Sequence, residues 1–429
     1  MKIKVQKLTT GAVLIAAASA FLFCGGFTKA SDYGNGENGY LKSATYYSDE
    51  WVINFWNSES SHMEEELKQI AEDGFNSIIL VVPWREFQPS MNPQRYNDYA
   101  WEKLDRVMEA AQRQNLKVML RVGYTWDYYS SDNVLERYEK LLYDDGTKRA
   151  WIQYAKRLYE RAAVHENFCG GFITWEDFWN FAENSVFYGS GLAGRKMASK
   201  CGYTQYVKEH YTLEELEEMY QDTFKTYEDV YLPDSLNTYS RKAFYQFYDD
   251  FLNKILAETQ AVFPDLSMEV RLDIDPVKRP DGTLEGVFHD ATFTCGSSGF
   301  TSAMYSVAMG FESNGQELSA DQALAGTGQN LERMSAANGS KKLYVDQFLF
   351  TDNTPGFEQN AKLTESEKSA YLDGVADIFK AKILGYAIWT YRDYGDNKLY
   401  NPQFALDKQG WDFSGGSYIE ERDGNKMAV

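Results

Sequence analysis

The sequence predicts a single (β/α)8 barrel, an α/β fold in which eight parallel strands form a closed wall covered by helices. Apolar runs of strand length alternate along the chain with amphipathic helical patterns, which is typical of repeated strand–helix units. Once a leader is set aside, about four hundred residues remain, a length that suits one large barrel with elaborated loops. We find no internal repeat, low-complexity tract or second domain.

The elements follow in order. The strands are expected at 51–57, 77–84, 117–124, 168–176, 267–275, then either 291–295 or 302–308, and finally 342–350 and 383–391. Helical patterns cover 63–73, 99–114, 148–164 and 241–263. Between about 178 and 235 lies a polar and aromatic insertion with one acidic helix near Leu213–Tyr220. A connection of this length inside a compact domain usually serves as a lid or a binding wall.

Residues 1–30 have the three regions of a secretory signal: lysines, an apolar run and a small-residue cleavage pattern ending at Ala30. The sequence therefore predicts a secreted chain whose single catalytic domain covers 31–429. Phe23 before Cys24 lacks the small side chain of a lipoprotein box, so a lipid anchor is the lesser alternative. An uncleaved anchor at the cell surface stays open, because the apolar run is only slightly shorter than a membrane-spanning helix.

The composition excludes several classes of partner. The leader holds four lysines and no acid, so its removal changes the formal charge from -20 to -24. Nucleic acid and anionic membranes are therefore not expected as partners, and no integral membrane domain is expected after cleavage. Three cysteines (Cys169, Cys201 and Cys295) remain, too few for a disulfide scaffold. The histidines form no zinc-type spacing, so no metal or other cofactor is expected.

Side-chain alternation predicts which residues face the interior of the barrel. In strand five the aliphatic residues must meet the helices, which turns Glu269, Arg271, Asp273 and Asp275 inward. In strand seven, Leu343, Val345 and Leu349 are expected outside and Tyr344, Asp346 and Phe348 inside. The same rule turns these residues inward from strands three, four and eight: Arg121, Thr174, Glu176, Ala387, Trp389 and Tyr391. These polar residues fall late in their strands, at the end where barrel active sites form, although interior Arg and Asp can also simply neutralise one another.

Paired carboxylates among aromatic rings are what glycosidic bond cleavage needs. One acid protonates the leaving oxygen, while a second carboxylate attacks the sugar carbon or activates water. The sequence has no nucleophile elbow, phosphate-binding loop or dinucleotide fingerprint that would favour another chemistry. Glu176 lies near an apolar strand end, a place that suits an acid catalyst.

Three segments resemble the second and third barrel units of clan A glycoside hydrolases, which include family-five cellulases and mannanases and family-forty-two β-galactosidases. They are V-V-P-W-R-E-F-Q-P at 81–89, R-Y-N-D-Y-A-W-E-K-L-D-R at 95–106 and N-L-K-V-M-L at 115–120. The resemblance covers about Trp51 to Trp411, as a pattern without a match to one family. It implies a retaining (β/α)8 enzyme with a Glu on strand four as acid/base, a Glu on strand seven as nucleophile, and a Trp on strand eight beneath the sugar. Glu176 and Trp389 match two of these positions.

Two departures from the clan pattern concern the reacting groups. Trp175 stands where the clan has Asn, and Asp346-Gln347 stand where it has Glu. If Gln347 takes the nucleophile position it cannot attack, whereas alternation sends Asp346 inward and Gln347 outward. We therefore expect Asp346 as the second carboxylate, with Asp273 as the alternative. A separation of the two carboxyls near 5 Å gives retention, and roughly 6.5 to 9.5 Å gives inversion.

Aromatic residues follow three strands and suit stacking on sugar rings. They are Trp126, Tyr128 and Tyr129, then Phe178 and Trp179, then Tyr391 and Tyr394. Several rings at one mouth indicate a polymeric or oligomeric substrate. The residues expected to bind substrate are Arg121, Trp126, Trp179, Arg271, Asp273, Tyr305, Trp389 and Tyr391.

The sequence therefore predicts a secreted endo-acting hydrolase of a β-linked polysaccharide. An exo-acting β-glycosidase or transglycosylase is the nearest alternative. A non-catalytic carbohydrate-binding barrel is the alternative that Gln347 supports, and an interaction protein using the acidic segment 212–229 has only charge in its favour.

Overall fold

The computed structural model describes residues 39–48, 50–60, 62–125, 134–236, 238–264, 266–271, 275–287, 289, 300–306, 316–338, 341–349, 361–392, 399–422 and 425–429. The expected leader (1–30), Cys295, Trp126 and Asp273 lie outside these residues. So does the 291–295 alternative for the sixth strand.

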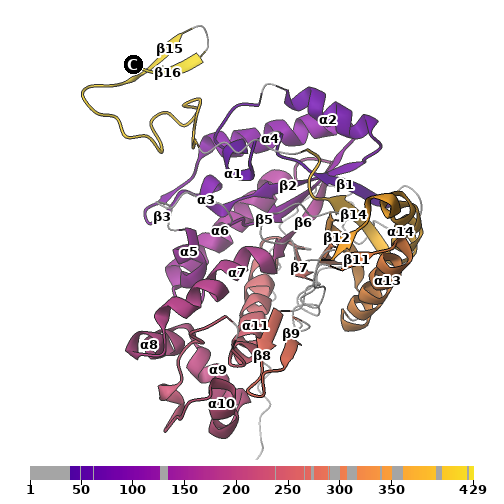
Figure 1. Cartoon of the computed structure of the whole chain (residues 1–429). Helices are drawn as coiled ribbons and strands as arrows, with labels where there is room; N and C mark the ends of the chain where they lie inside the picture. Colours follow the sequence, from indigo (N-terminus) through magenta and orange to yellow (C-terminus); the bar gives the residue numbers. More distant parts are fainter. Residues whose placement is uncertain are drawn as a thin grey trace, which may run out of the picture.

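Eight parallel strands close into a barrel, which confirms the predicted fold (Figure 1). In chain order they are β1 (Leu41–Thr45), β2 (Ser77–Val82), β5 (Lys117–Val122), β6 (Phe168–Thr174), β7 (Ser267–Arg271), β10 (Phe300–Ser306), β12 (Lys342–Leu349) and β14 (Ile383–Ile388). Each strand pairs with the next, and β1 pairs with both β2 and β14, so the wall has no open edge.

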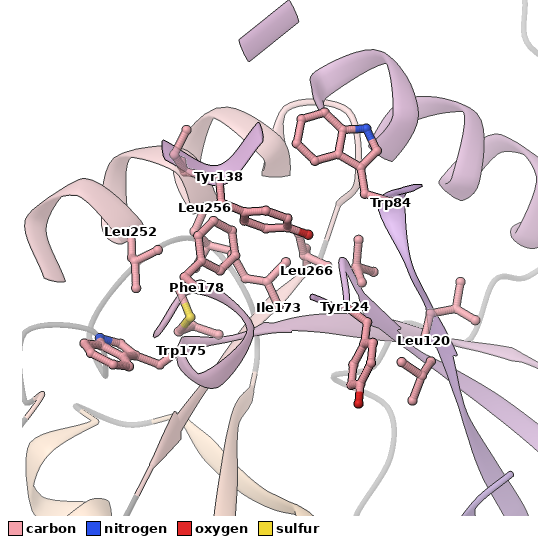
Figure 2. Packing of buried hydrophobic residues seen from close by; sticks show 14 of the residues in the cluster. Trp84, Leu120, Tyr124, Tyr138, Ile173, Trp175, Phe178, Leu252, Leu256 and Leu266 are labelled. Atoms are coloured by element: carbon pink, nitrogen blue, oxygen red, sulfur yellow. The ribbon is translucent and has the colours of Figure 1, made fainter. Parts of the chain in front are cut away.

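Helices cover the outside of this wall. The longer ones are α2 (Met63–Glu72), α4 (Asp98–Arg113), α6 (Asp145–Ala162), α11 (Arg241–Gln260), α13 (Ala320–Ala337) and α14 (Lys368–Lys382). In α4 the buried residues Trp101, Leu104, Met108 and Ala111 recur every three or four positions, so one apolar stripe meets the barrel. Figure 2 shows part of the aromatic packing between helices and strands, where Phe178 lies against Tyr138 with ring centroids 5.0 Å apart.

The prediction of the first strand at 51–57 is wrong. That segment contains the short helix α1 (Val52–Phe55), and the first barrel strand is β1, further towards the N-terminus. All four residues of α1 are buried, and a short buried run has the same apolar composition in a helix as in a strand. β1 was missed because it carries Ser43 and Thr45, which lower its apolar content.

Side chains from six strands fill the barrel interior as a separate cluster: Leu41, Ile79, Met119, Cys169, Phe172, Tyr344, Leu384 and Ala387. Polar groups in this layer are paired. The Tyr344 hydroxyl donates to Ser43 Oγ at 2.7 Å, and Ser43 Oγ lies 2.5 Å from Ser77 Oγ. The interior is therefore a packed core and not a pore.

β12 carries one extra residue relative to β10, and relative to β14 it carries one between Val345 and Phe348 that offsets an opposite shift between Leu343 and Val345. On the β10 side, Ala303 and Met304 pair with Val345 and Gln347, and on the β14 side the register shifts in the same interval. This bulge at Asp346 ends the simple alternation. Phe348, expected inside, instead packs outward against Phe379 of α14 with ring centroids 5.1 Å apart. Gln347, expected outside, accepts a hydrogen bond from the interior Arg121 at 3.4 Å. The inward direction expected for Phe348 and the outward direction expected for Gln347 are both wrong, because the bulge at Asp346 shifts the alternation.

The chain between β6 and α11 is helical. It forms α7 (Trp175–Asn184), η2 (Ser185–Tyr188), α8 (Leu192–Cys201), α9 (Tyr203–His210), α10 (Leu213–Tyr220) and η3 (Tyr227–Asp229). Figure 1 shows α8, α9 and α10 gathered at one end of the molecule, near the hairpin of β8 (Asp275–Lys278) and β9 (Leu284–Val287). The expected strand at 267–275 thus ends at Arg271, and Asp275 belongs to this hairpin.

Smaller elements complete the chain: α3 (Trp84–Phe87), α5 (Val134–Lys140), η4 (Glu365–Glu367), β3 (Ser90–Met91), β4 (Gln94–Arg95), β11 (Glu317–Leu318), β13 (Lys362–Leu363), β15 (Ile419–Arg422) and β16 (Asn425–Ala428). The antiparallel β15–β16 hairpin stands away from the barrel in Figure 1. Within the described residues, none of the helices has the length and apolar character needed to cross a membrane.

Candidate active site

Arg121 is the centre of a charged cluster at the carboxyl ends of the strands. It comes from the end of β5, and its side chain is buried. Its Nε donates to Asp177 Oδ2 at 3.0 Å, and its Nη2 donates to Asp177 Oδ1 and Glu176 Oε2, both at 3.1 Å. Burial alone would lower the pKa of Arg121, but the carboxylates of Asp177 and Glu176 raise it well above its usual value. The guanidinium therefore stays charged and holds both acids.

The first turn of α7 carries both acids and is fixed by a reciprocal cap. The Asp177 amide donates to Thr174 Oγ1 at 2.8 Å, and the Thr174 hydroxyl donates to Asp177 Oδ2 at 2.6 Å. Thr174, the last residue of β6, thus caps the helix through its side chain, and the acid three residues later bonds back to the same hydroxyl. Thr125 Oγ1 also donates to the Asp177 carbonyl at 2.6 Å. The helix therefore starts directly at the strand end, and Glu176 lies in its first turn.

Asp177 is a structural anchor. Its side chain is fully buried and its two oxygens accept three hydrogen bonds from Arg121 and Thr174. Burial raises the pKa of Asp177 to about 6, against the opposing effect of Arg121. Glu176 differs, since 22% of its side chain is exposed while it keeps its contact with Arg121. Glu176 can therefore meet a ligand, whereas Asp177 holds the arginine.

Three further polar residues lie at this end of the barrel. Gln347 shares the Arg121 guanidinium with Glu176, so an amide and a carboxylate lie on one cation. Glu269 of β7 pairs in register with Thr174, is buried, and contributes to the charge field at Arg121. Asp346, at the bulge of β12, is 2% exposed.

Aromatic rings line the other side of Arg121. Its guanidinium carbon lies 5.4 Å from the centre of the Tyr124 ring and 5.6 Å from that of Trp389. Tyr47 lies edge-on to Trp51, and these two rings contact Trp389 and Tyr124 respectively, with centroids 6.2 and 6.1 Å apart. The peptide bond after Trp389 is cis. Two rings thus lie against the cation, and two more pack against those rings.

The structure brings Arg121, Glu176 and Trp389 of the expected site together. Tyr391 is not brought to this cluster: its hydroxyl donates to Asp73 at 2.6 Å and its ring lies edge-on to Phe75. β14 ends at Ile388, so alternation does not extend to Tyr391. Phe178, expected to stack on sugar, is buried against Tyr138. Trp126 and Asp273 lie outside the described residues, and so do the side chains of Trp179, Arg271 and Tyr305.

Sequence reasoning missed Asp177, Tyr124, Tyr47 and Trp51 as members of the cluster. The Thr174-x-x-Asp177 spacing was a usable signal, because it marks the start of a helix. No local pattern identifies the three rings, since their neighbours are distant in sequence. Among the described residues, no group of three or more His, Cys, Asp or Glu side chains could hold a metal ion.

Fold and site together define a (β/α)8 barrel with carboxylates and rings gathered around one arginine at the carboxyl ends of its strands. No protein-family model and no curated protein matches the sequence.

Several solved structures that are similar to this chain are glycosidases. A catalytic mutant of a GH42 β-galactosidase from G. stearothermophilus has a TM-score of 0.56 at 10% identity, over 84% of this chain and 52% of that chain. A β-galactosidase from the psychrophilic Marinomonas ef1 has a TM-score of 0.53 at 13% identity, over 84% and 56%. A GH5_18 enzyme from Bifidobacterium longum, in complex with Manb1-4GlcNAc, has a TM-score of 0.51 at 13% identity, over 85% and 72%.

This chain therefore has the fold of clan A glycoside hydrolases, which confirms the fold that the resemblance implied. It spans about half the length of the two galactosidases.

Proposed function

We propose that this protein hydrolyses β-glycosidic bonds in a polysaccharide, with Glu176 as the general acid/base. The observation that carries the proposal is the exposure of Glu176. Of the described carboxylates at this end of the barrel, Asp177, Glu269 and Asp346 are buried, and Glu176 alone is substantially open to a ligand. An acid catalyst must reach the leaving oxygen, so Glu176 is the group that fits this role.

The proposed second carboxylate is Asp346. Both oxygens of Asp177 are occupied by Arg121 and Thr174, so Asp177 cannot attack without breaking the anchor of α7. Asp346 stands near the carboxyl end of the seventh barrel strand, where the clan resemblance implies the nucleophile. Asp346 is 2% exposed in the free protein. We propose a retaining reaction in which sugar binding opens the site at Asp346, and its carboxylate attacks the sugar carbon as Glu176 protonates the leaving oxygen. Water activated by Glu176 then releases the sugar from Asp346.

We further propose that the enzyme is secreted and endo-acting. The basic, apolar and small-residue regions of 1–30 support export. Trp51 and Trp389 support more than one sugar subsite, because these two rings are half-buried and can stack on a sugar face, whereas Tyr47 and Tyr124 are buried behind them. An exo-acting enzyme would release single sugars or disaccharides from the first turnover, so the sizes of early products separate the two modes.

The test is hydrolysis of β-glucans, mannans, xylans and bacterial exopolysaccharides by the wild type, Glu176→Gln and Asp346→Asn. Both substitutions are expected to lower the rate by about 100-fold or more, since each removes a reacting group. Glu218→Gln, on the exposed face of α10, is the matched control and should keep full activity. The anomeric form of the first product, read by proton NMR, tests retention. Turnover that survives in both variants would overturn the assignment.

A carbohydrate-binding barrel without turnover is the second candidate, and the position of Gln347 favours it. Gln347 lies on the same guanidinium as Glu176, where a nucleophilic carboxylate would stand, and an amide cannot attack. In that case the wild type binds a glycan without cleaving it. Gln347→Glu should then create measurable hydrolysis, whereas under the first proposal Asp346 already supplies the second carboxylate.

A further inference from the structure

A buried hydrogen-bonded group lies behind the proposed acid, on the side away from Arg121. Trp175, directly before Glu176, donates its indole N–H to Asp249 Oδ1 at 2.7 Å. His289 Nδ1 lies 2.9 Å from the same oxygen. The Trp175 and His289 rings are 4.1 Å apart between centroids, and all three side chains are excluded from solvent.

This arrangement turns Trp175 away from the sugar site. Figure 2 shows its indole near the helix that carries Leu252, well apart from Tyr124, which contacts Arg121. Its ring also lies edge-on to Tyr248 and Tyr245 of α11. Trp175 therefore does not make the sugar contact that the clan resemblance assigns to an Asn at this position. Its contacts are instead with α11, outside the barrel.

Asp249 is a costly residue for this position. A buried carboxylate loses its hydration and is tolerated only when hydrogen bonds compensate, so an apolar residue would fill the same space more cheaply. A carboxylate, unlike an apolar side chain, fixes the orientation of the groups that donate hydrogen bonds to it. Its Oδ1 fixes the indole N–H, and it fixes His289 as the tautomer that carries a hydrogen on Nδ1.

The first turn of α7 is thus held from both sides. Asp177 ties it to Arg121 inside the barrel, and Trp175 ties it to Asp249 of α11 outside. A third contact, from the Tyr248 hydroxyl to the Phe178 carbonyl at 2.9 Å, joins the same two helices. Glu176 lies between the two anchors, so its backbone cannot rotate unless one of them breaks.

We propose that Asp249, supported by His289, is a positioning residue that aims the Glu176 carboxyl at the leaving oxygen through Trp175. This inference rests on the proposed function. Proton transfer depends steeply on geometry, and a displacement of about 1 Å can cost a hundredfold in rate. Loss of the anchor should therefore impair the protonation step more than sugar binding.

The test compares leaving groups. The dinitrophenolate of a dinitrophenyl glycoside departs without protonation. The phenolate of a phenyl glycoside of the same sugar needs a proton from the acid to depart. Asp249→Asn and Trp175→Phe are each expected to lower kcat/KM about tenfold or more on the phenyl substrate and to change it less than about threefold on the dinitrophenyl substrate. Asp250→Asn, the neighbouring residue on α11, is the control and should leave both values unchanged.

Equal losses on the two substrates in both variants would overturn the inference, because a general structural defect does not depend on the leaving group. Thermal unfolding shows whether Asp249→Asn folds. If it does not, the comparison of leaving groups rests on Trp175→Phe, which keeps an aromatic ring at this position and removes the N–H donor with the second ring. A wild type that cleaves neither substrate would overturn the proposed function together with this inference. Wild-type turnover with an unchanged leaving-group ratio in the variants would overturn this inference alone.

Discussion

Glu176 and Asp177 are neighbours in the chain, yet their surroundings give them different chemistry. Asp177 is buried with every oxygen bonded, and Glu176 keeps part of its side chain open. Both depend on Arg121, whose charge is retained by the acids it holds. The division between an anchoring acid and an available acid therefore comes from burial and not from residue type.

Ionisation of Asp177 should oppose stability as the pH rises. Its pKa is about 6 in the native state and 3.8 as an ordinary carboxyl, so between these values the native state binds the proton that the unfolded state has released. The free energy of unfolding contributed by this group therefore falls from about pH 4 to pH 6, by about 3 kcal/mol. Urea unfolding of the wild type and Asp177→Asn at several pH values should show their difference shrinking across this window. The exposed Asp377→Asn should show no such trend. The assignment would be contradicted if Asp177→Asn and the wild type had the same free energy of unfolding at every pH.

At the residue scale, strand alternation was sufficient for Arg121, which lies within β5. Glu176 and Trp389 also reach the cluster, but the expectation that they lie on strands is wrong, because β6 ends at Thr174 and β14 ends at Ile388. Strand alternation was not sufficient for Gln347. The bulge that turns Gln347 inward is a property of pairing with β10 and β14, and nothing within 342–350 marks it.

At the scale of elements, the long helices and most barrel strands were predictable, whereas short buried segments were not. α4 and α11 extend over many turns, so their apolar stripes stand out. β1 and α1 are only 5 and 4 residues long, and tertiary packing decides which conformation each one takes.

The end of α1 depends on a buried lysine. Lys103 of α4 donates to the Phe55 and Ser58 carbonyls, the latter at 2.7 Å, and burial lowers its pKa to about 7. Lys103→Met should lower the free energy of unfolding by about 1–3 kcal/mol for each carbonyl left without its donor. Between pH 7 and the ordinary value of 10.5 the unfolded state binds more protons, so the wild type gains stability as the pH rises. The difference between wild type and variant should therefore be larger at pH 9 than at pH 7.

Urea midpoints at the two pH values measure this effect, with the exposed Lys68→Met as the control. A difference that stays constant or shrinks from pH 7 to pH 9 would contradict the lowered pKa of Lys103.

Closure of the barrel requires a glycine in β14. Gly385 pairs with Leu41 of β1, and a Cβ at Gly385 would lie 2.2 Å from the Leu41 carbonyl oxygen. Gly385→Ala must therefore push β1 away, at a cost of about 3 kcal/mol. Gly326→Ala in α13 meets no atom within 4 Å and should instead stabilise by about 0.5–1 kcal/mol. Thermal unfolding of both variants checks the pair, and equal melting temperatures would show that β1 adjusts freely.

At the scale of the whole molecule, the negative net charge is expected to weaken the binding of acidic glycans. The chain carries a formal charge of -20. Carboxymethyl cellulose should therefore bind more weakly than hydroxyethyl cellulose, which has the same β-linked backbone without the charge. The difference between the two dissociation constants should decrease as the salt concentration rises from about 0.05 M to about 0.5 M, because ions screen the repulsion. Calorimetric titration of both polymers measures the two dissociation constants. A difference that increases with salt concentration would contradict the electrostatic cause.

The extra residue in β12 also bears on how this barrel can change its chemistry. Because the pairing with β10 and β14 resumes on either side, two successive side chains, a carboxylate and an amide, are offered at the same mouth. Moving the irregularity by one position would exchange the group beside Arg121 while every other strand kept its place. In this protein, the register of a single strand decides which side chain of β12 lies beside Arg121, so a change in chain length there would exchange that group without a change of residue type.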